Sequence, residues 1–209
     1  MTFTFGILLF WGPKLLVTDK HLPASIANVK LGIYMTLGGL IGTIAGGWIG
    51  DLFARWLRGG YFLLCGLSAI LGAVPLIVVI ATRSESLLFP AIFVTSVFLL
   101  LGNGPVNAII VNSVPPDVRS TAMATTILAI HFLGDAISIK LVGTISTWIA
   151  ERFTAGLSLP GIFAPFAGML GLTGAESLSV AMLIAPVALL IAGLLFFLGL
   201  RGGSAKTVR

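Results

Sequence analysis

Charged residues are scarce in this chain of 209 residues. Asp, Glu, Lys and Arg make up 9% of it, whereas 57% of the residues are apolar and the mean hydropathy is +1.12. A soluble domain carries about 25% charged residues and a disordered chain has few apolar ones, so both classes are excluded. A membrane-spanning helix needs about 20 largely apolar residues. The composition therefore predicts an all-α integral membrane protein whose first partner is the lipid bilayer.

Several kinds of chemical site are also absent from the sequence. The single cysteine, Cys65, lies inside an apolar run, which excludes a disulfide framework and a cysteine-based metal site. There is no Gly-x-x-x-x-Gly-Lys loop, no His-Glu-x-x-His and no Gly-x-Ser-x-Gly. We therefore expect no enzyme, no ATP-driven pump, no metal and no cofactor. The net charge of +5 comes from cations that are scattered singly, which indicates membrane topology rather than nucleic-acid binding.

Turn residues and isolated charges divide the apolar sequence into six segments of helical length. Pro115 and Pro116 end one of them, because proline donates no backbone hydrogen bond. Asp117 and Ser120 follow, and we expect their side-chain oxygens to cap the next helix. We predict a single domain, 1–209, with six membrane spans at about 3–16, 25–53, 61–81, 87–114, 119–150 and 178–200, and an outer loop over 152–177.

The positive charges predict how these spans are oriented, because cytoplasmic loops are enriched in Lys and Arg. If the first helix runs outward, the inner cations are Arg55, Arg58, Arg119, Arg201, Lys206 and Arg209, and the outer ones are Lys20, Arg83 and Arg152. This favours a multi-pass chain with both termini inside, in the cell (inner) membrane. Lys14 and Lys30 lie near outer helix ends, where they can snorkel to the interface, and counting them weakens the bias.

Glycines follow a strict spacing of four residues along the second predicted span. They lie on one helix face, where small residues let two helix backbones approach closely in lipid. The four are Gly38, Gly42, Gly46 and Gly50. Near the end of this span Asp51 precedes Arg55 by four residues. We expect Asp51 to pair with Arg55 or to face the positive N-terminus of a neighbouring helix.

The fifth predicted span carries a histidine and an aspartate one turn apart, His131 and Asp135, deep inside an apolar helix. Ionisable groups are costly in lipid, so they should face a watery cavity or each other. This predicts a site on a substrate or proton path. The alternative is a neutral His131 that bonds Asp135 and only fixes helix packing. Helical spacing places six residues on one stripe, namely Ala124, Leu128, His131, Asp135, Ser138 and Val142.

Polar residues on the fourth and first spans supply expected partners for this pair. Asn103 and Asn107 are one turn apart, and Pro105 between them removes a backbone donor and kinks the helix. Kinked helices near the bilayer midplane often form transporter sites, whereas amide groups that only join two helices are an equal alternative. Lys14 is expected either to attract an anionic head group or to snorkel to the interface.

Several stretches together resemble the spinster branch of the major facilitator superfamily. Gly47, Asp51, Arg55 and Arg58 are similar to the superfamily's loop motif Gly-x-x-x-Asp-(Arg/Lys)-x-Gly-Arg. The stretches that resemble the C-terminal half of the spinster branch are Gly104-Pro-Val-Asn-Ala-Ile-Ile-Val-Asn112, Val114-Pro-Pro-Asp-Val-Arg-Ser-Thr-Ala122 and Ile130-His-Phe-Leu-Gly-Asp-Ala-Ile-Ser138.

The resemblance implies a fold and a function. The chain would form helices seven to twelve of a transporter, as one half-bundle of two inverted three-helix repeats. Its partner would be an N-terminal six-helix half, either missing from this sequence or a separate chain, or a second copy of this chain. The substrate would be an amphipathic anion, a lysophospholipid or sphingoid phosphate, moved by alternating access with proton coupling. Another organic substrate, such as a drug, sugar or organic acid, and a non-transporting membrane scaffold stay open as alternatives.

The resemblance also implies roles for single residues. His131, Asp135 and Ser138 would face the substrate path, with Asn103 and Asn107 opposite them and Lys14 in its outer half. Gly47, Asp51, Arg55 and Arg58 would form a cytoplasmic gate. Asp117, Arg119 and Ser120 would mark the start of helix eleven.

Overall fold

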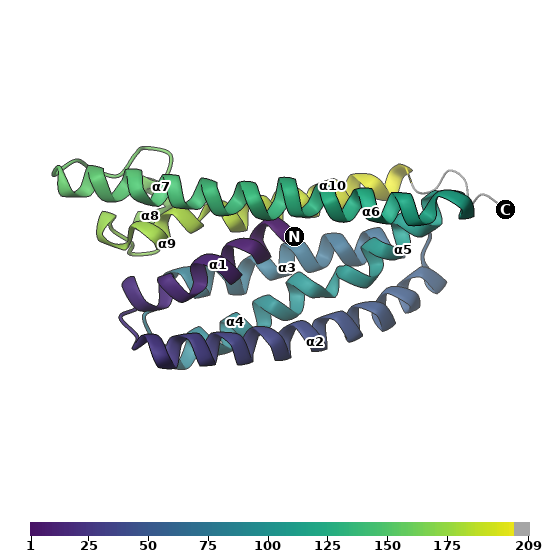
Figure 1. Cartoon of the computed structure of the whole chain (residues 1–209), viewed down its shortest axis with the longest axis horizontal. Coiled ribbons are helices and arrows are strands. Elements are labelled where there is room, and N and C mark those ends of the chain that lie inside the picture. Colours follow the sequence, from purple (N-terminus) through teal and green to yellow (C-terminus); the bar gives the residue numbers. More distant parts are fainter. Residues whose placement is uncertain (203–209) are drawn as a thin grey trace.

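The computed structural model describes residues 1–202, and the side chains of residues 1–200. In Figure 1 these residues form an elongated bundle of helices. The elements are α1 (Thr2–Thr18), α2 (Ala24–Trp56), α3 (Gly60–Ala81), α4 (Glu85–Leu101), α5 (Asn103–Ser113), the 3-10 turn η1 (Pro116–Val118), α6 (Arg119–Ala129), the π-helical segment η2 (Ile130–Ala136), α7 (Ile137–Thr154), α8 (Ala164–Met169), the 3-10 turn η3 (Gly174–Glu176), α9 (Ser177–Met182) and α10 (Ile184–Gly202).

Five helical stretches are long and apolar enough to cross a membrane, which makes the chain an all-α membrane protein. They are 24–56, 60–81, 85–113, 116–154 and 174–200, while α1, with 17 residues, is a shorter apolar helix. The helices begin and end within a few residues of the six predicted segments. The expected outer loop differs most, because α7 continues to Thr154 and the loop contains α8 and η3. The arrangement as two inverted repeats stays a prediction.

The glycine face of α2 packs directly on α4. At Gly46 an added Cβ atom would lie 1.9 Å from the carbonyl oxygen of Leu101. Gly38 and Gly42 meet the α4 backbone in the same way, at 2.6 and 2.3 Å. Real Cβ atoms do not approach backbone oxygens so closely, so only glycine fits at these positions. The close helix approach predicted from the spacing of four is therefore confirmed.

The fourth predicted span is interrupted at Gly102, between α4 and α5. Pro105 has no N–H to donate to the carbonyl of Leu101, one turn earlier, so the helical ladder loses a bond there. The ladder resumes at the next residue, because Val106 N donates to the carbonyl of Gly102 at 2.9 Å. The Leu101 carbonyl at this interruption lies against Gly46 of α2.

The helices lie roughly along the long axis of the bundle, and their connections gather at its two ends (Figure 1). We name the ends after their residues. The Arg83 end holds the loops between α1 and α2 and between α3 and α4, and the segment after α7. The Arg55 end holds the connections between α2 and α3 and between α5 and α6. Of the predicted inner cations, Lys206 and Arg209 and the side chain of Arg201 lie outside the described residues.

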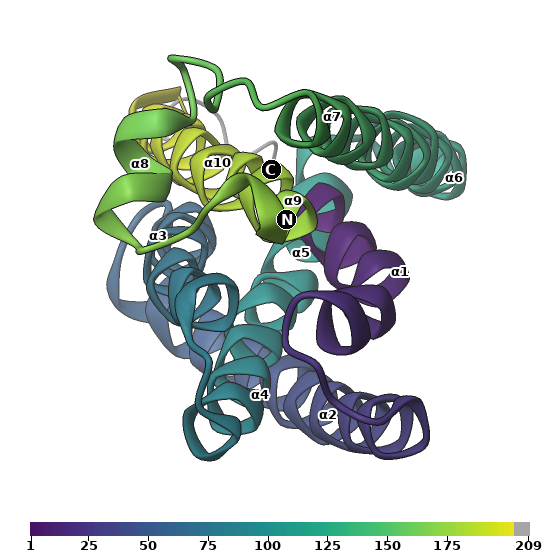
Figure 2. The same cartoon turned by 90° about the vertical axis from the view of Figure 1, so that its left-hand side faces the viewer.

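Figure 2 looks along the bundle and shows α1 between α7 and α2, with α3 and α10 on the other side. The apolar core forms where α1, α3, α4 and α9 meet. Its fully buried side chains include Ile7, Leu15, Leu76, Ile92 and Leu178. The described residues of α6 and η2, in contrast, include no buried residue. The helix formed by α6, η2 and α7 therefore lies at the outside of the bundle, on the same side as α1 and α2.

Candidate functional site

His131 and Asp135 form an ion-pair contact within the π-helical segment η2. Nδ1 of His131 lies 2.6 Å from Oδ2 of Asp135, and their side chains are 62% and 27% exposed. A π-helix is rare, and where it occurs inside an α-helix it is frequently found at functional sites. Of the two arrangements expected, the structure shows the one in which the residues face each other, and their place on a substrate or proton path stays a prediction. Because the imidazole is largely exposed, the contact is not sealed inside the bundle.

The second carboxylate oxygen of Asp135 faces α1 instead. Oδ1 is buried and has no hydrogen-bond partner among the described residues. A Cβ atom on Gly6 would lie 2.8 Å from it, so α1 approaches the carboxylate through a glycine. Asp135 thus has one oxygen held by His131 and one free oxygen directed into the seam with α1.

The predicted single stripe along the fifth span is wrong. Leu128 is 69% exposed and His131 is exposed, whereas Val142 and Ser138 are fully buried. The π-helical segment is the physical reason, because its turns contain more residues than α-helical turns and rotate the face that follows. The hydroxyl of Ser138 donates to the carbonyl of Asp135 at 2.9 Å. Ser138 therefore supports the backbone of the pair and does not face an open cavity in this structure.

Asn103 and Asn107 are exposed on α5 and make no side-chain hydrogen bond among the described residues. A groove between α5 and α6 is lined by other residues, including Ile109 and Thr125. The structure therefore does not bring the two asparagines together with His131. Lys14 is exposed on α1, and its Nζ lies 5.4 Å from the ring centroid of Trp11.

The predicted gate residues lie at the Arg55 end of α2. Asp51 does not pair with Arg55, since its Oδ1 accepts a hydrogen bond from the hydroxyl of Tyr61 at 2.8 Å. This contact joins the end of α2 to the start of α3 across a short loop. Arg55 and Arg58 are exposed and make no ion pair with the described residues. A Cβ atom added to Gly47 would have no other atom within 4 Å.

The start of α6 differs from the prediction. Its N-cap is Val118, with no side-chain hydrogen bond, so Asp117 and Ser120 do not cap the helix. The reason is that Pro116 begins a 3-10 turn, which delivers the chain into α6 with Asp117 inside that turn. Arg119 acts elsewhere, because its Nε donates to the carbonyl of Val111 near the end of α5 at 3.1 Å.

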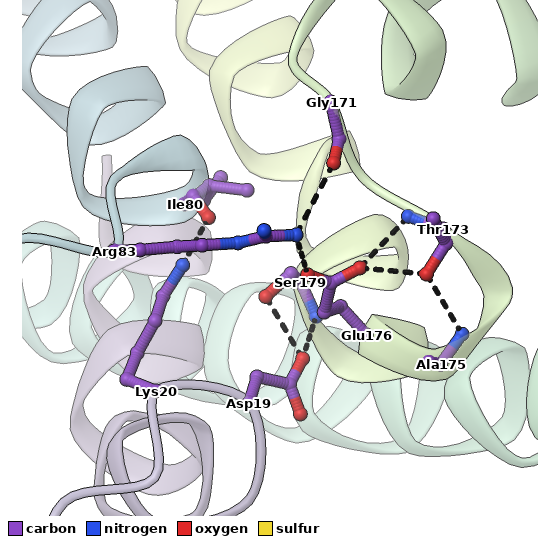
Figure 3. A network of polar contacts seen from close by, with 9 residues as sticks. All are labelled: Asp19, Lys20, Ile80, Arg83, Gly171, Thr173, Ala175, Glu176 and Ser179. Carbon is purple, nitrogen blue, oxygen red and sulfur yellow. Dashed lines mark hydrogen bonds and ion pairs between the residues drawn. The ribbon is translucent and has the colours of Figure 1, made fainter.

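At the Arg83 end, polar contacts join three parts of the chain (Figure 3). Asp19, which follows α1, is buried, and its Oδ2 accepts from both N and Oγ of Ser179 at 2.8 Å each. Arg83, in the loop before α4, lies 2.5 Å from Glu176 through Nη2 and Oε1. Glu176 also accepts from N and Oγ of Thr173. These contacts tie the segment before α9 to α1 and to the α3–α4 loop.

Lys20 belongs to the same network. Its Nζ donates to the carbonyl of Ile80, at the end of α3, at 2.5 Å. Burial lowers the pKa of Lys20, and the negative charges of Asp19 and Glu176 partly oppose that shift. The sequence analysis did not predict this network, because it joins residues from three parts of the chain that are far apart in sequence.

A groove of about 820 Å³ runs between α1 and α2. Most of its lining is apolar, with Leu31 and Met35 from α2. Three polar residues of α2 also line it, namely Asn28, Thr36 and Thr43. The three are exposed and make no side-chain hydrogen bond within the described part of the chain. Their spacings of eight and seven residues place them on one helix face, a pattern that the sequence analysis did not single out.

Comparison with known proteins identifies the family. The model of the Major Facilitator Superfamily matches residues 1–139. Protein spinster homolog 3 of Homo sapiens is 31% identical over 165 residues, which are 73% of this chain and 32% of that protein. The probable sphingolipid transporter spinster homolog 2 of Arabidopsis thaliana is 26% identical over 167 residues, or 80% of this chain and 34% of that protein.

A solved structure shares the fold. The bacterial homolog to the human lysosomal transporter Spinster, in an inward-facing and unoccupied conformation, gives a TM-score of 0.79 at 20% sequence identity. The match covers 96% of this chain and 45% of that chain. The chain thus spans about a third of the length of the curated relatives it matches. It is a multi-pass integral membrane protein, not an enzyme, and it belongs to the Major Facilitator Superfamily as a spinster-like transporter chain.

Proposed function

We propose that this chain is the C-terminal half, helices seven to twelve, of a secondary transporter that moves an amphipathic anion of the lysophospholipid or sphingoid-phosphate type. Transport proceeds by alternating access between this bundle and a second one, and it is coupled to protons. The spinster relatives and the partial coverage of a solved spinster structure support this proposal. The mainly apolar groove between α1 and α2 favours an amphiphile over a sugar, which would need many polar partners.

The contact between His131 and Asp135 is the observation that carries the proposal. A histidine and an aspartate within a membrane helix are tolerated where they border a wet passage or a partner. His131 is exposed on a helix with little of its surface covered, and Asp135 keeps one oxygen without a donor. A proton can therefore be taken up at that oxygen or at the imidazole.

A second six-helix bundle covers the exposed side of α6 and η2 in this proposal. Leu128 and Phe132 are 69% and 66% exposed there, so both side chains are accessible to a packing partner. With the Arg55 end on the cytoplasmic side, Arg55, Arg58 and Arg119 obey the positive-inside rule. Asp51 and Tyr61 would then close the cytoplasmic end of the path, beside Gly47.

Reconstitution in liposomes tests the proposal. The chain is inserted alone and together with a candidate N-terminal half, and uptake of a labelled lysophospholipid is followed under a pH gradient. We expect uptake only by the pair, and only with the gradient. Asp135→Asn together with His131→Ala should reduce uptake to the level of empty liposomes, since both proton-binding groups are lost. His21→Asn is the control, because it removes the other histidine, which lies in the α1–α2 loop.

Uptake by the pair that survives the double substitution would contradict the role of His131 and Asp135. Uptake of sugars or organic acids, with none of the lysophospholipid, would contradict the substrate class while leaving the fold assignment untouched. Either result can be obtained with the same vesicles.

A further inference from the structure

We propose that the α8 segment, residues 157–172, lies in the bilayer interface at the Arg83 end and anchors this end of the bundle to lipid. Its partner is the boundary between the lipid head groups and the acyl chains. The side chains that enter this boundary are Ile162, Phe166 and Met169. This contact with lipid does not depend on the substrate or on proton coupling.

The α8 segment and its flanks carry no charge. Residues 153–175 contain no Asp, Glu, Lys or Arg, although they include the whole connection between α7 and η3. Connections that run through water are usually polar, because their side chains and backbone groups face the solvent. An uncharged connection of this length is therefore better suited to an environment that is partly apolar.

The α8 segment is apolar on both of its faces. Toward the protein, Ala167 is fully buried, and Phe163 and Leu170 pack against the apolar core. Away from it, Ile162, Phe166 and Met169 are 76%, 61% and 86% exposed. A helix that is apolar all round is normally enclosed by protein or by lipid. Large apolar side chains that are exposed close together mark an interaction surface.

Many backbone groups of the segment are bonded within it. Ala164 N donates to the carbonyl of Pro160 at 3.0 Å, and Leu172 N donates to the carbonyl of Ala167 at 2.9 Å. Pro160 and Pro165 have no N–H that needs an acceptor. An unpaired peptide group is costly where water is scarce. These internal bonds therefore allow the segment to lie at the edge of the hydrocarbon.

Two arginines hold the two ends of the segment. Nε and Nη2 of Arg152, near the end of α7, both donate to the carbonyl of Ser158 at 3.4 Å. Nη2 of Arg83 donates to the carbonyl of Gly171 at 3.4 Å. The guanidinium carbon of Arg152 also lies 5.5 Å from the ring centroid of Trp148. Tryptophan collects at the head-group level and arginine extends toward it, so these contacts place the segment at that depth.

The position of α8 in the bundle favours lipid over a second bundle as its partner. In Figure 2, α8 lies at the outer edge of the molecule, on the side of α3 and α10 and away from α6. The proposed second bundle covers the exposed side of α6 and η2 instead. A multi-pass membrane protein already contacts lipid around its outer helices, so the α8 segment extends an existing interface with the bilayer.

Spin labelling of the full chain in nanodiscs measures the depth of the segment. Met169→Cys carries the nitroxide, and Cys65, the other thiol, is replaced by alanine. Collisions with oxygen, which concentrates in lipid, are compared with collisions with a nickel chelate, which stays in water. We expect oxygen to dominate, with the label about 5–10 Å below the phosphates, as for an interfacial helix.

Ser84→Cys is the matched control, because Ser84 is exposed in the loop before α4 at the same end of the bundle. Its label should collide mainly with the nickel chelate. If the nickel chelate dominates equally at both positions, the segment lies in water and the inference is overturned. Protection of the label at position 169 from both reagents would show that protein covers it, which would also overturn the inference.

The wild-type chain provides a test that needs no substitution. A phosphatidylcholine with a diazirine near the head-group end of its acyl chain is activated by light in nanodiscs, and the labelled peptides are identified by mass spectrometry. We expect the label within residues 157–170, and more of it there than in the α3–α4 loop, residues 82–84. Label in α10 with none in the α8 segment would overturn the inference.

Arg152→Gln tests the contact that holds the start of the segment. The substitution removes the guanidinium from the Ser158 carbonyl and from Trp148, so the nitroxide at position 169 should shift toward water. Arg58→Gln removes an exposed arginine at the opposite end and should leave the depth unchanged. If both variants keep the original depth, Arg152 does not set the position of the segment and that step is wrong.

Discussion

The region built from α2, α3, α4 and α10 differs sharply from the long helix formed by α6, η2 and α7. In the first region, glycines bring the α2 and α4 backbones into direct contact, and Ile92 and Leu76 are fully buried. In the second, α6 and η2 contain no buried residue among those described, and large apolar side chains face outward. One region is held together by its own packing, whereas the other borders something outside this chain.

The difference has a physical origin. Helices in lipid associate mainly through close packing of small residues, and α2 supplies these at regular intervals. The long helix carries instead the ionisable residues His131 and Asp135, together with bulky side chains such as Phe132. Its α6 and η2 part buries no residue among those described, whereas α7 packs on the bundle through Val142 and Ile149. Stability and function are therefore concentrated in different parts of the same chain, and substitutions can separate them.

The largest expected effect is on the packed region. Gly46→Leu places a side chain where even a Cβ would be 1.9 Å from the Leu101 carbonyl oxygen, so α2 and α4 must separate. We expect a loss of stability of more than about 3 kcal/mol, measured by thermal unfolding in detergent with tryptophan fluorescence. Gly47→Leu is the matched control, because an added Cβ there meets nothing within 4 Å. Similar melting of both variants would contradict the close helix contact.

A second pair of substitutions compares the two regions directly. Ile92→Ala removes a fully buried side chain from α4 and should cost about 2–5 kcal/mol. Phe132→Ala removes a side chain that is 66% exposed and should change the stability of the isolated chain by less than about 0.5 kcal/mol. Thermal unfolding measures both. If Phe132→Ala destabilises the isolated chain as much as Ile92→Ala does, the long helix is part of the core after all.

The smallest expected effect is a pH dependence at the Arg83 end. Burial lowers the pKa of Lys20 in the folded chain below its ordinary value of 10.5. At a pH between the lowered pKa of Lys20 in the folded chain and the value of 10.5 in the unfolded chain, the unfolded chain binds more protons than the folded one. The free energy of unfolding therefore rises with pH in this alkaline range. The gain should be less than about 1 kcal/mol, because the lysine is only partly buried.

Lys20→Gln isolates this effect. Glutamine keeps an N–H donor for the carbonyl of Ile80 but does not titrate, so the alkaline gain in melting temperature should disappear. The comparison between wild type and variant removes the contribution of other groups that titrate at high pH. A wild-type chain whose stability falls through the same window, relative to the variant, would show that Lys20 is stabilised in its charged form.

Much of the helical framework was predictable, because spans and glycine faces depend on composition and short repeats. The contact of His131 with Asp135 followed from their spacing of four residues. Ser138 was misplaced, since a π-helical segment leaves no mark in hydrophobic periodicity. The partner of Asp51 was also not predictable, because Tyr61 reaches it only after the loop between α2 and α3 has folded. A contact between side chains of two successive helices, such as that of Asp51 with Tyr61, depends on the tertiary structure.

The close approach of Gly46 to the Leu101 carbonyl has a consequence for motion. The two helix backbones touch there, so pulling α2 away from α4 would break close packing along the whole glycine face. We therefore expect α2 and α4 to travel as one rigid body in any conformational cycle. Bending is left to the chain beyond Gly102, where α5 can pivot without breaking that seam.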